Sequence, residues 1–293
     1  MSNPAGKKRT LLTITAVCAA VAAAIIMLVL SVIFQDTSLA RHQQEGVIHI
    51  GYAPEAPYAF LTPAGEVTGE SPEVARQITA RLGIPHVVWR QSEFGALITE
   101  LEAGLIDVIA AGMFITPERA ERVNFSAPTF HVRQGLLVPK GNPRQLHSYR
   151  QAVTTADINL AALAGSVEED MLLQLGLPGR RLTIVPDALT GRVAVETGFA
   201  DGLALSAPTV QWMALQNLLG KTEMAHPFDH IQGEKSGYGA FAFRKEDRRL
   251  LAAWNEALQS YLGSPEHLAL VARFGFTPAE LPRPATPVEA PAR

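Results

Sequence analysis

The sequence predicts an α/β protein made of two lobes that are joined by two crossing strands. Short β-branched segments alternate with amphipathic helical segments at the spacing of βαβ units, which favours mostly parallel sheets. A sharp break at residues 139–143, Pro-Lys-Gly-Asn-Pro, separates a first set of such units from a second. The alternating segment 238–243 then indicates a return to the first lobe. With 293 residues the chain is long enough for this arrangement.

The first lobe is expected over residues 41–138 and 236–280. A strand at 47–52 leads into a loop, and the Pro and Gly within 61–66 predict a hairpin turn. Ser71-Pro72-Glu73 is expected to be the N-cap and first turn of a helix that ends at Gly83. The remaining expected elements are a strand at 87–89, a helix at 94–101, a strand at 106–111 and a helix at 246–262.

The second lobe is expected over residues 139–235. Its segments repeat the alternation of the first lobe, so its sheet is also expected to have helices against it. The predicted elements are strands at 158–163, 182–185 and 202–205, and helices at 167–175, 189–197 and 207–219. Two such lobes create a cleft at strand ends and helix N-termini, where open α/β sheets bind small ligands, and they imply a hinge.

An apolar segment without charged residues runs from residue 11 to residue 34, after a basic cluster at 7–9. This pattern predicts a signal peptide or a membrane anchor at 1–40 and places the rest in the periplasm or another extracytoplasmic space. Small residues at Ser38 and Ala40 fit cleavage after Ala40, whereas the length of the segment also fits a retained transmembrane helix. Both outcomes remain open. The proline-rich residues 281–293 are expected to form a disordered tail.

Composition and motifs exclude several classes of function. A net charge of -3 supplies no basic field for nucleic acid. No G-x-S-x-G, H-E-x-x-H, P-loop or G-x-G-x-x-G motif is present, and the single cysteine, Cys18, lies in the apolar segment. His226 and His230 flank Pro227 in an expected loop, which favours surface roles over metal binding. Neither a metal nor a cofactor is expected, and a carboxylate pair remains a possible acid/base source.

Two helix N-termini follow expected strands and are suited to bind a charged solute. In residues 111–119 Thr116 is the expected N-cap and Arg119 lies in the first turn, where its guanidinium can bind a carboxylate bidentately. An Arg on a solvated helix face is the alternative. Residues 164–168 repeat the form and offer Glu168 to a cation, although acids there also simply stabilise a helix dipole.

Three segments are landmarks of a known family: 116–119 (Thr-Pro-Glu-Arg), 123–128 (Val-Asn-Phe-Ser-Ala-Pro) and 243–247 (Phe-Arg-Lys-Glu-Asp). With them the chain resembles the periplasmic solute-binding proteins of ABC importers, polar amino acid type, family 3, over residues 46–278. The resemblance implies the type II two-lobe binding-protein fold, a small-molecule ligand, an ABC permease and an ATPase as partners, and no catalysis.

Within that family the chain is most similar to ectoine- and hydroxyectoine-binding proteins. The segments that carry this similarity are 55–58, 69–73, 93–95 and 111–116. Amino acid binders of the family usually hold the α-ammonium group with an Asp in an Asp-x-Pro motif, and the matching residue here is Ser206. This departure disfavours an ordinary α-amino acid as the ligand.

The resemblance also implies roles for individual residues. Glu55 would bond the ring nitrogens of ectoine, Arg119 its carboxylate, and Glu168 with the Val167 backbone would close the second lobe over it. Aromatic faces suit the delocalised cation of ectoine. Each aromatic residue taken alone is better explained by core packing, but three of them at matching motif positions favour a cage around the cation. The expected ligand-binding residues are Glu55, Tyr58, Phe94, Phe114, Thr116, Arg119, Val167 and Glu168.

Three rival functions stay open beside the compatible-solute receptor. A polar amino acid receptor would use the same cleft. A periplasmic dehydratase-like enzyme on this fold would need an acid/base group there, for which Glu55 or Glu168 is available. A sensor module would depend on an uncleaved N-terminal helix.

Overall fold

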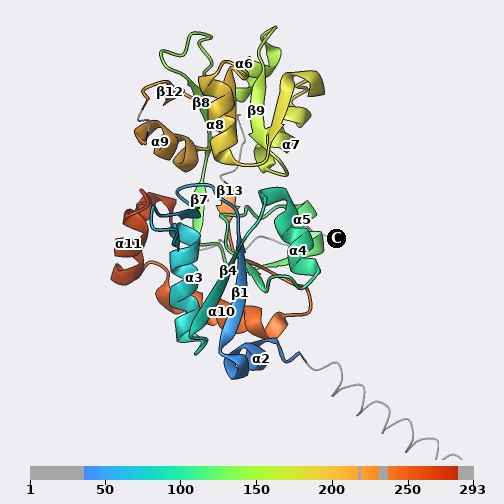
Figure 1. The fold of residues 1–293 in the computed structure, drawn as a ribbon, viewed down its shortest axis with the longest axis vertical. Coiled ribbons are helices and arrows are strands. Elements are labelled where there is room, and N and C mark those ends of the chain that lie inside the picture. Colours follow the sequence, from blue (N-terminus) through green and yellow to red (C-terminus); the bar gives the residue numbers. More distant parts are fainter. Residues whose placement is uncertain (1–35, 217–218, 231–236, 283–293) are drawn as a thin grey trace, which may run out of the picture. The chain divides into compact units, whose positions relative to one another are not determined.

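Two mixed five-stranded sheets form the body of the protein (Figure 1). The computed structural model describes residues 36–216, 219–230 and 237–282. The apolar segment at 11–34 and most of the proline-rich tail lie outside these residues. A compact unit begins at Ser38. Within the described ranges, no helix combines the length and apolarity that crossing a bilayer requires.

The first sheet has three parallel strands and an antiparallel edge. Strand β1 pairs in parallel with β4 and β5, and β14 pairs antiparallel with β5 and β6. In sheet order the strands are β4 (His86–Gln91), β1 (Val47–Tyr52), β5 (Val108–Ile109), β14 (Ala242–Phe243) and β6 (Asn124–Phe125). The parallel strands bring their carboxyl ends to one edge, from which the loops of the cleft leave.

The second sheet has the same mixed character. Strand β9 pairs in parallel with β10 and β11, while β8 pairs antiparallel with β11 and β12. The order is β10 (Leu182–Val185), β9 (Leu160–Leu163), β11 (Gly202–Ser206), β8 (Gln134–Pro139) and β12 (Thr222–Met224). Because β8 belongs to this sheet, the chain enters the second sheet at Gln134, ahead of the boundary expected at residue 139. The expected limits of the moving lobes remain a prediction.

Two short strands connect the sheets. Strand β7 (Phe130–Val132) pairs antiparallel with β13 (Gly237–Gly239), and both lie between the sheets in Figure 1. The sequence predicted a single strand over 238–243, which is wrong: β13 and β14 are separate strands. The chain bends between them because β13 pairs with β7, whereas β14 pairs with β5 and β6. Within the bend, the Phe241 N–H donates to Ser126 Oγ at 3.1 Å. The expected hairpin is present as β2 (Phe60–Leu61) and β3 (Val67–Thr68).

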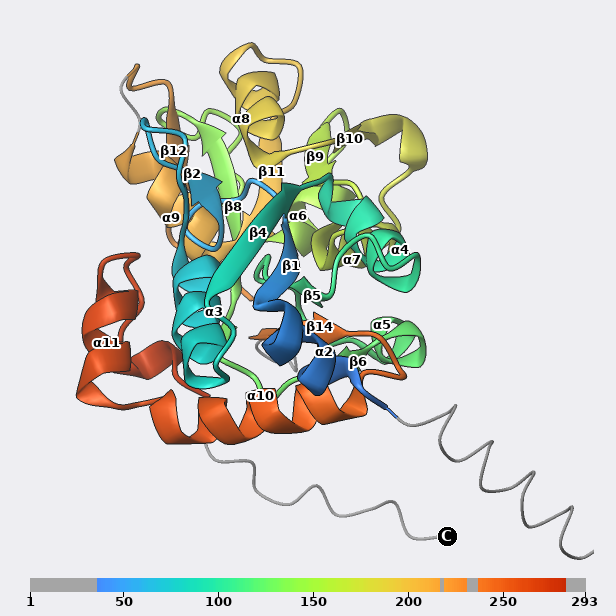
Figure 2. The same cartoon turned by 60° about the horizontal axis from the view of Figure 1, so that its bottom comes forward.

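The helices lie on both faces of each sheet (Figures 1 and 2). In the first lobe, Val108 of β5 packs in the cluster of α3 and α10, and its neighbour Ile109 packs in that of α4. The helices of this lobe are α2 (Ser38–Glu45), α3 (Glu70–Arg81), η1 (Phe94–Ala96), α4 (Leu97–Glu102), α5 (Pro117–Arg122), α10 (Arg248–Tyr261), α11 (Pro265–Ala272) and η3 (Pro278–Glu280). Those of the second are α6 (Tyr149–Thr154), α7 (Val167–Gln174), η2 (Gly179–Arg181), α8 (Ala188–Glu196) and α9 (Ala207–Leu215).

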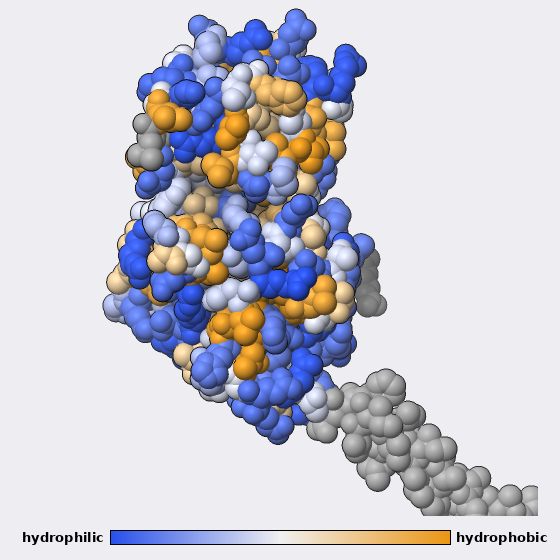
Figure 3. All heavy atoms as spheres, viewed as in Figure 1, coloured by the Kyte–Doolittle hydropathy of each residue, from blue (hydrophilic) through white to orange (hydrophobic). Residues whose placement is uncertain are grey.

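Helix α10 supplies the core of the first lobe. Its buried residues Leu250, Trp254, Leu258 and Tyr261 recur every three or four positions, so they form one apolar face. The Trp254 ring lies 5.0 Å from the Phe241 ring, edge on, and is completely buried. On the outer face shown in Figure 3, hydrophobic side chains are spread in small groups among polar ones, as is usual for a protein surface in water.

Helix α3 begins one residue earlier than its expected cap. Gly69 occupies the N-cap with φ of 126°, and Ser71, expected to be the N-cap, lies inside the helix. The first two helical N–H groups need no side-chain cap, because Glu70 N and Ser71 N donate to the carbonyls of Pro57 and Tyr58. The Ser71 hydroxyl is thereby free to donate to Glu70 Oε2 at 2.7 Å.

Helix α2 was not expected from the sequence, and it is part of the folded unit. Ser38 is buried and its Oγ accepts the N–H of Leu250 at 3.2 Å, in the first turn of α10. Asp247, the N-cap residue of α10, makes no side-chain capping bond, so the Ser38 hydroxyl caps this helix instead. Ser38, Leu39 and Ala40 lie in α2. Cleavage after Ala40 remains a prediction, and it would remove this contact.

A chain that begins at Arg41 is therefore expected to be less stable than one that begins at Asp36. Loss of the Ser38 cap alone lowers the free energy of unfolding by about 1 kcal/mol. This corresponds to a Tm that is lower by roughly 2–4 °C for a chain of this size. Calorimetric unfolding of the two chains tests this, with Ser38→Ala in the longer chain as the matched variant. Equal Tm values for all three would show that α2 contributes nothing.

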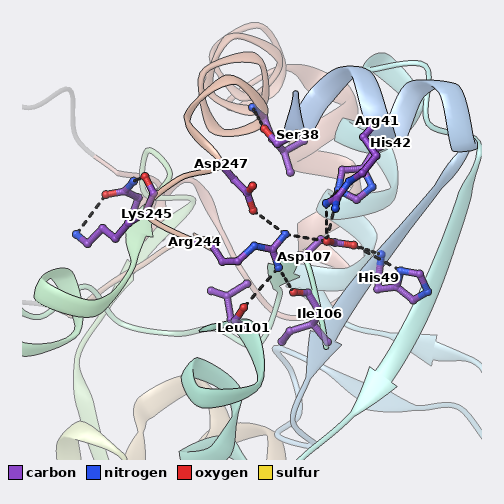
Figure 4. Close-up of polar contacts among 12 residues, drawn as sticks. Ser38, Arg41, His42, His49, Leu101, Ile106, Asp107, Arg244, Lys245 and Asp247 are labelled. Atoms are coloured by element: carbon purple, nitrogen blue, oxygen red, sulfur yellow. Dashed lines mark hydrogen bonds and ion pairs between the residues drawn. The ribbon is translucent and has the colours of Figure 1, made fainter. Parts of the chain in front are cut away.

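A buried ion network holds α2 against the sheet (Figure 4). Asp107 lies at its centre and accepts from Arg244 Nη2 at 2.9 Å, Arg41 Nη2 at 3.3 Å and the His49 N–H at 3.0 Å. His42 Nε2 lies 3.5 Å from the same carboxylate. Burial alone would raise the pKa of Asp107, but the hydrogen bonds from His42 and Arg244 hold it well below its usual range. Burial opposes protonation of His42, yet Asp107 raises the His42 pKa.

Candidate binding cleft

The cleft lies where strands of both sheets end. Residues after β1, β4 and β5 form its first wall, and residues after β9 and at the end of β11 form the second. Its lining residues are Glu55, Tyr58, Phe94, Gly112, Phe114, Arg119, Ser166, Val167, Glu168 and Ser206. The cavity they enclose is small, and residues of both walls surround it. A solute is therefore expected to enter when the lobes move apart.

The structure brings together seven of the eight expected residues. Thr116 is the exception, because its Oγ1 accepts the Arg119 N–H at 3.2 Å as the N-cap of α5 and it does not line the cavity. Gly112 and Ser166 line the cavity without having been expected there, and so does Ser206, which the sequence singled out only as the residue in place of the family's Asp. Ser206 ends β11 directly before α9, and this strand-to-helix turn was the available signal.

Arg119 connects the two walls. Its Nη1 donates to the carbonyl of Phe114 at 2.8 Å, and its Nη2 donates across the cleft to the carbonyl of Gly165 at 2.9 Å. The guanidinium carbon lies 5.3 Å from the centre of the Phe94 ring. Among the described residues of the lining, Arg119 is the one basic side chain. A ligand carboxylate is accordingly matched to this position.

Two buried carboxyl groups face the same cavity. Burial raises the pKa of Glu55 to about 7, against the hydrogen bond from Thr209 and the charge of Arg119. Burial also raises the pKa of Glu168 to about 8, and the nearby Glu55 charge adds to that shift. Because the lining has two carboxyl groups and only one guanidinium, it can compensate a further positive charge on a ligand. This inventory suits a ligand that carries both a carboxylate and a cation.

The aromatic residues of the lining have different surroundings. Tyr58 is buried and stacks on Phe130 with ring centres 4.9 Å apart, so its ring is also part of the core. Phe114 meets Phe130 edge on at 6.4 Å, and Phe94 contacts the Arg119 guanidinium. All three rings nevertheless border the cavity and offer faces to a cation.

Glycine at position 112 makes room for Tyr58. Its φ is 64°, and a Cβ added there would lie 2.5 Å from Tyr58 Cγ. Any side chain at this position would therefore displace the tyrosine ring from the cavity wall.

Two further glycines allow the walls to meet. A Cβ on Gly95, in the first wall, would lie 3.1 Å from the carbonyl oxygen of Ala164 in the second. A Cβ on Gly165 would lie 3.0 Å from the Cα of Gly95. The lobes thus approach backbone to backbone beside Arg119.

Gly95→Ala is expected to push the facing backbone away by a few tenths of an ångström and to weaken ligand binding several-fold, because the walls can then no longer approach as closely. Gly179→Ala is the matched control, because no atom lies within 4 Å of the added Cβ and its φ is ordinary. Calorimetric titration of both variants compares the affinities. Equal affinity for Gly95→Ala and the parent chain would contradict the close approach of the walls.

A second cavity of about 350 Å³ lies away from the expected residues. Its lining includes Arg133, Trp212, Phe274 and Glu280, and it contains no acid or aromatic residue of the cleft. No cluster of three or more His, Cys, Asp or Glu side chains suited to a metal ion is found in the described ranges.

A two-lobe α/β fold with a charged and aromatic cleft between its lobes defines a solute-binding protein of type II. The chain belongs to the bacterial extracellular solute-binding proteins, family 3, whose family model matches residues 48–277. The family and the fold expected from the sequence are thereby confirmed.

Known relatives agree with this assignment. A probable amino-acid ABC transporter periplasmic-binding protein of Sinorhizobium fredii is 35% identical over 268 residues, which cover 90% of this chain and 88% of the relative. The crystal structure of EhuB in complex with hydroxyectoine superposes with a TM-score of 0.77 at 31% identity, over 83% of this chain and 93% of that chain. An ancestral amino acid-binding protein, a precursor of cyclohexadienyl dehydratase, shares the fold with a TM-score of 0.72 at 24% identity, over 80% and 98% of the two chains.

Proposed function

We propose that this protein is the receptor of an ABC importer for ectoine or hydroxyectoine, and that it delivers the solute to a membrane permease and its ATPase outside the cytoplasm. The observation that carries the proposal is the charge pattern of the cleft: one guanidinium, two carboxyl groups and three aromatic rings line one cavity. The relation to EhuB, crystallised with hydroxyectoine, supports the same ligand class.

Each group in the cleft has a matching part in such a ligand. The ligand carboxylate would bind Arg119, and the delocalised ring cation would lie between Glu55 and the faces of Phe94 and Phe114. Glu168 would approach the cation from the second lobe. Closure follows because these contacts come from both walls and are complete only when the walls meet.

Calorimetric titration with ectoine, hydroxyectoine, proline, glutamine and arginine tests the proposal. We expect one-to-one binding of ectoine or hydroxyectoine at least tenfold tighter than of any amino acid. Phe114→Ala should weaken ectoine binding about 2- to 30-fold, the range of a cation–π contact of about 0.5–2 kcal/mol. Phe114→Leu keeps apolar bulk without an aromatic face and should show the same loss. Tightest binding of an amino acid would refute the assignment.

A dehydratase-like enzyme is the second candidate, favoured by the raised pKa values of Glu55 and Glu168, both produced first by burial. Incubation with a candidate hydroxy acid and detection of product by chromatography distinguishes it. Stoichiometric ectoine binding with no turnover would reject the enzyme.

Ectoine affinity is expected to increase with pH, by up to about tenfold per pH unit for each proton released. Burial raises the pKa of Glu55 to about 7 and that of Glu168 to about 8, so closure around uncompensated carboxylates becomes less favourable as pH rises through this window. A ligand cation removes that penalty and favours the ionised carboxylates, so binding releases protons.

Titrations between about pH 6 and about pH 8, in buffers of different ionisation enthalpy, count the released protons. Glu168→Gln should flatten the pH dependence, because it removes one of the two titrating groups. A constant affinity across this range, with the same heat in every buffer, would contradict the linkage.

A further inference from the structure

Four side-chain oxygens form a continuous hydrogen-bonded chain that crosses the cleft from the first wall to the second and returns to the first. Tyr58 OH lies 2.9 Å from Ser206 Oγ, Ser206 Oγ lies 3.1 Å from Thr209 Oγ1, and Thr209 Oγ1 lies 2.8 Å from Glu55 Oε1. Tyr58 and Glu55 belong to the loop after β1, whereas Ser206 and Thr209 belong to the end of β11 and the first turn of α9. All four residues are buried, and Thr209 is completely so.

The donors of this chain can be assigned from the number of protons available. Each hydroxyl has one proton to donate. The Thr209 hydroxyl donates to the Glu55 carboxyl, so it has no proton left for Ser206. Ser206 therefore donates to Thr209, and Tyr58 donates to Ser206. Each of the three hydroxyls therefore donates to the next group along the chain, and the last acceptor is Glu55.

Opening the cleft must break this chain at two places. The Ser206–Thr209 contact lies within one wall and survives, but Tyr58–Ser206 and Thr209–Glu55 each join opposite walls. The two residues that lose their partners, Tyr58 and Glu55, are both among the residues expected to bind the ligand. Their orientation is thus tied to closure.

We propose that Ser206 and Thr209 are positioning residues that hold Tyr58 and Glu55 in the ligand-binding orientation in the closed protein and thereby slow ligand release. This inference rests on the proposed function of the cleft. It also gives Ser206 a role of its own at the place where the family resemblance would put an Asp. A carboxylate there would add a third negative charge next to Glu55 and Glu168, whereas two hydroxyls keep this part of the wall neutral.

Glu55 is the one charged group in this chain of hydrogen bonds. The guanidinium of Arg119, which lines the same cavity, is bonded to backbone carbonyls. The hydroxyls can therefore be removed one at a time without leaving an unpaired charge other than Glu55 itself.

The test compares Thr209→Val and Ser206→Ala with the parent chain, using ectoine as the ligand. Calorimetry gives the affinity and stopped-flow fluorescence gives the rates, since Trp212 contacts Phe60 across the cleft at 5.5 Å and reports closure. Each variant should bind ectoine roughly tenfold more weakly, as expected for loss of a buried hydrogen bond to a carboxyl or hydroxyl group. The loss should appear as faster dissociation with little change in association.

Two further variants distinguish a specific effect on the positions of Tyr58 and Glu55 from a general loss of protein structure. Thr209→Ser keeps the hydroxyl and should restore most of the affinity, whereas Thr154→Val removes an exposed hydroxyl of the same lobe and should have no effect. Circular dichroism and Tm verify folding. Unchanged dissociation in both Thr209→Val and Ser206→Ala would overturn the inference.

Failure of the proposed function would look different. If the parent chain does not bind ectoine, the receptor assignment fails, and small-angle X-ray scattering of the protein without ligand then decides the inference. A larger radius of gyration for the Ser206→Ala/Thr209→Val double variant than for the parent chain supports a contact that favours closure. Equal radii overturn it.

Discussion

Replacing Arg119 with alanine is expected to weaken ectoine binding roughly 30-fold or more, because truncating one partner of a buried charged contact costs about 2–5 kcal/mol. Arg119 is the one basic side chain among the described residues of the cavity lining, so no described neighbour can replace it. Its contact with the Gly165 carbonyl also joins the walls, and the loss of this contact should favour opening. Calorimetric titration measures the loss.

Two variants make this result specific. Arg119→Lys keeps the charge without the planar fork and should recover only a small part of the affinity. Arg122→Ala, in the same helix, removes an exposed ion pair with Glu102 and should leave the affinity unchanged. Binding of ectoine by Arg119→Ala within threefold of the parent chain would show that the carboxylate is held elsewhere.

Asp107→Ala is expected to lower the free energy of unfolding by about 2–3 kcal/mol, since it removes one of the two carboxylates that the buried Arg244 guanidinium contacts and leaves Asp247 as the other. The ion pair between Arg244 and Asp107 has both side chains only 9% exposed. Arg41 and His42 lose the same partner, so α2 should loosen as well. Denaturant unfolding at neutral pH measures the effect, and Glu102→Ala, in an exposed pair, should cost about 0–1 kcal/mol.

The pH dependence of this difference has a defined sign. Because His42 and Arg244 hold the pKa of Asp107 well below its usual range, its stabilisation is present above the unfolded pKa of about 3.9 and is lost as pH falls through the folded value. His42, whose pKa Asp107 raises against the effect of burial, stabilises the fold most below about pH 6.5 and less as pH rises. A difference between Asp107→Ala and the parent chain that stays constant down to pH 3 would contradict this account.

Much of the fold follows from local sequence patterns. The β-branched run of β1 and the Pro and Gly of the hairpin act through their own backbone preferences, so the sequence predicts them directly. The caps at Thr116 and Ser166 do the same, since each side chain accepts an N–H three residues ahead. These features need no information from distant parts of the chain.

Elements whose ends depend on distant partners were misjudged. Helix α3 begins at Glu70 because carbonyls of the loop after β1 accept its first N–H groups, and no local residue reveals that. The separation of β13 from β14 follows from a change of pairing partner. Helix α2 is stabilised by the hydrogen bond between Ser38 and the first turn of α10 and by the ion network around Asp107. Both contacts join segments that are far apart in sequence.

The candidate site shows the same difference between residues that local motifs predict and residues whose contacts depend on distant parts of the chain. Motif positions sufficed to propose Glu55, Phe114 and Arg119 together, and the structure places them around one cavity. Thr116 is the N-cap that the sequence predicts and does not line the cavity, so its part in ligand binding stays a prediction. Thr209 was not expected, since its relation to Glu55 exists only when the two walls meet.

A crystal structure of the protein with ectoine tests the central claim most directly, because it shows which cavity and which residues hold the ligand. We predict the ligand between the two sheets, with its carboxylate at Arg119, its ring against Phe94 and Phe114, and its cation at Glu55. Ectoine bound instead in the 350 Å³ cavity beside Trp212 and Phe274, or an amino acid found in the cleft in its place, would contradict the account.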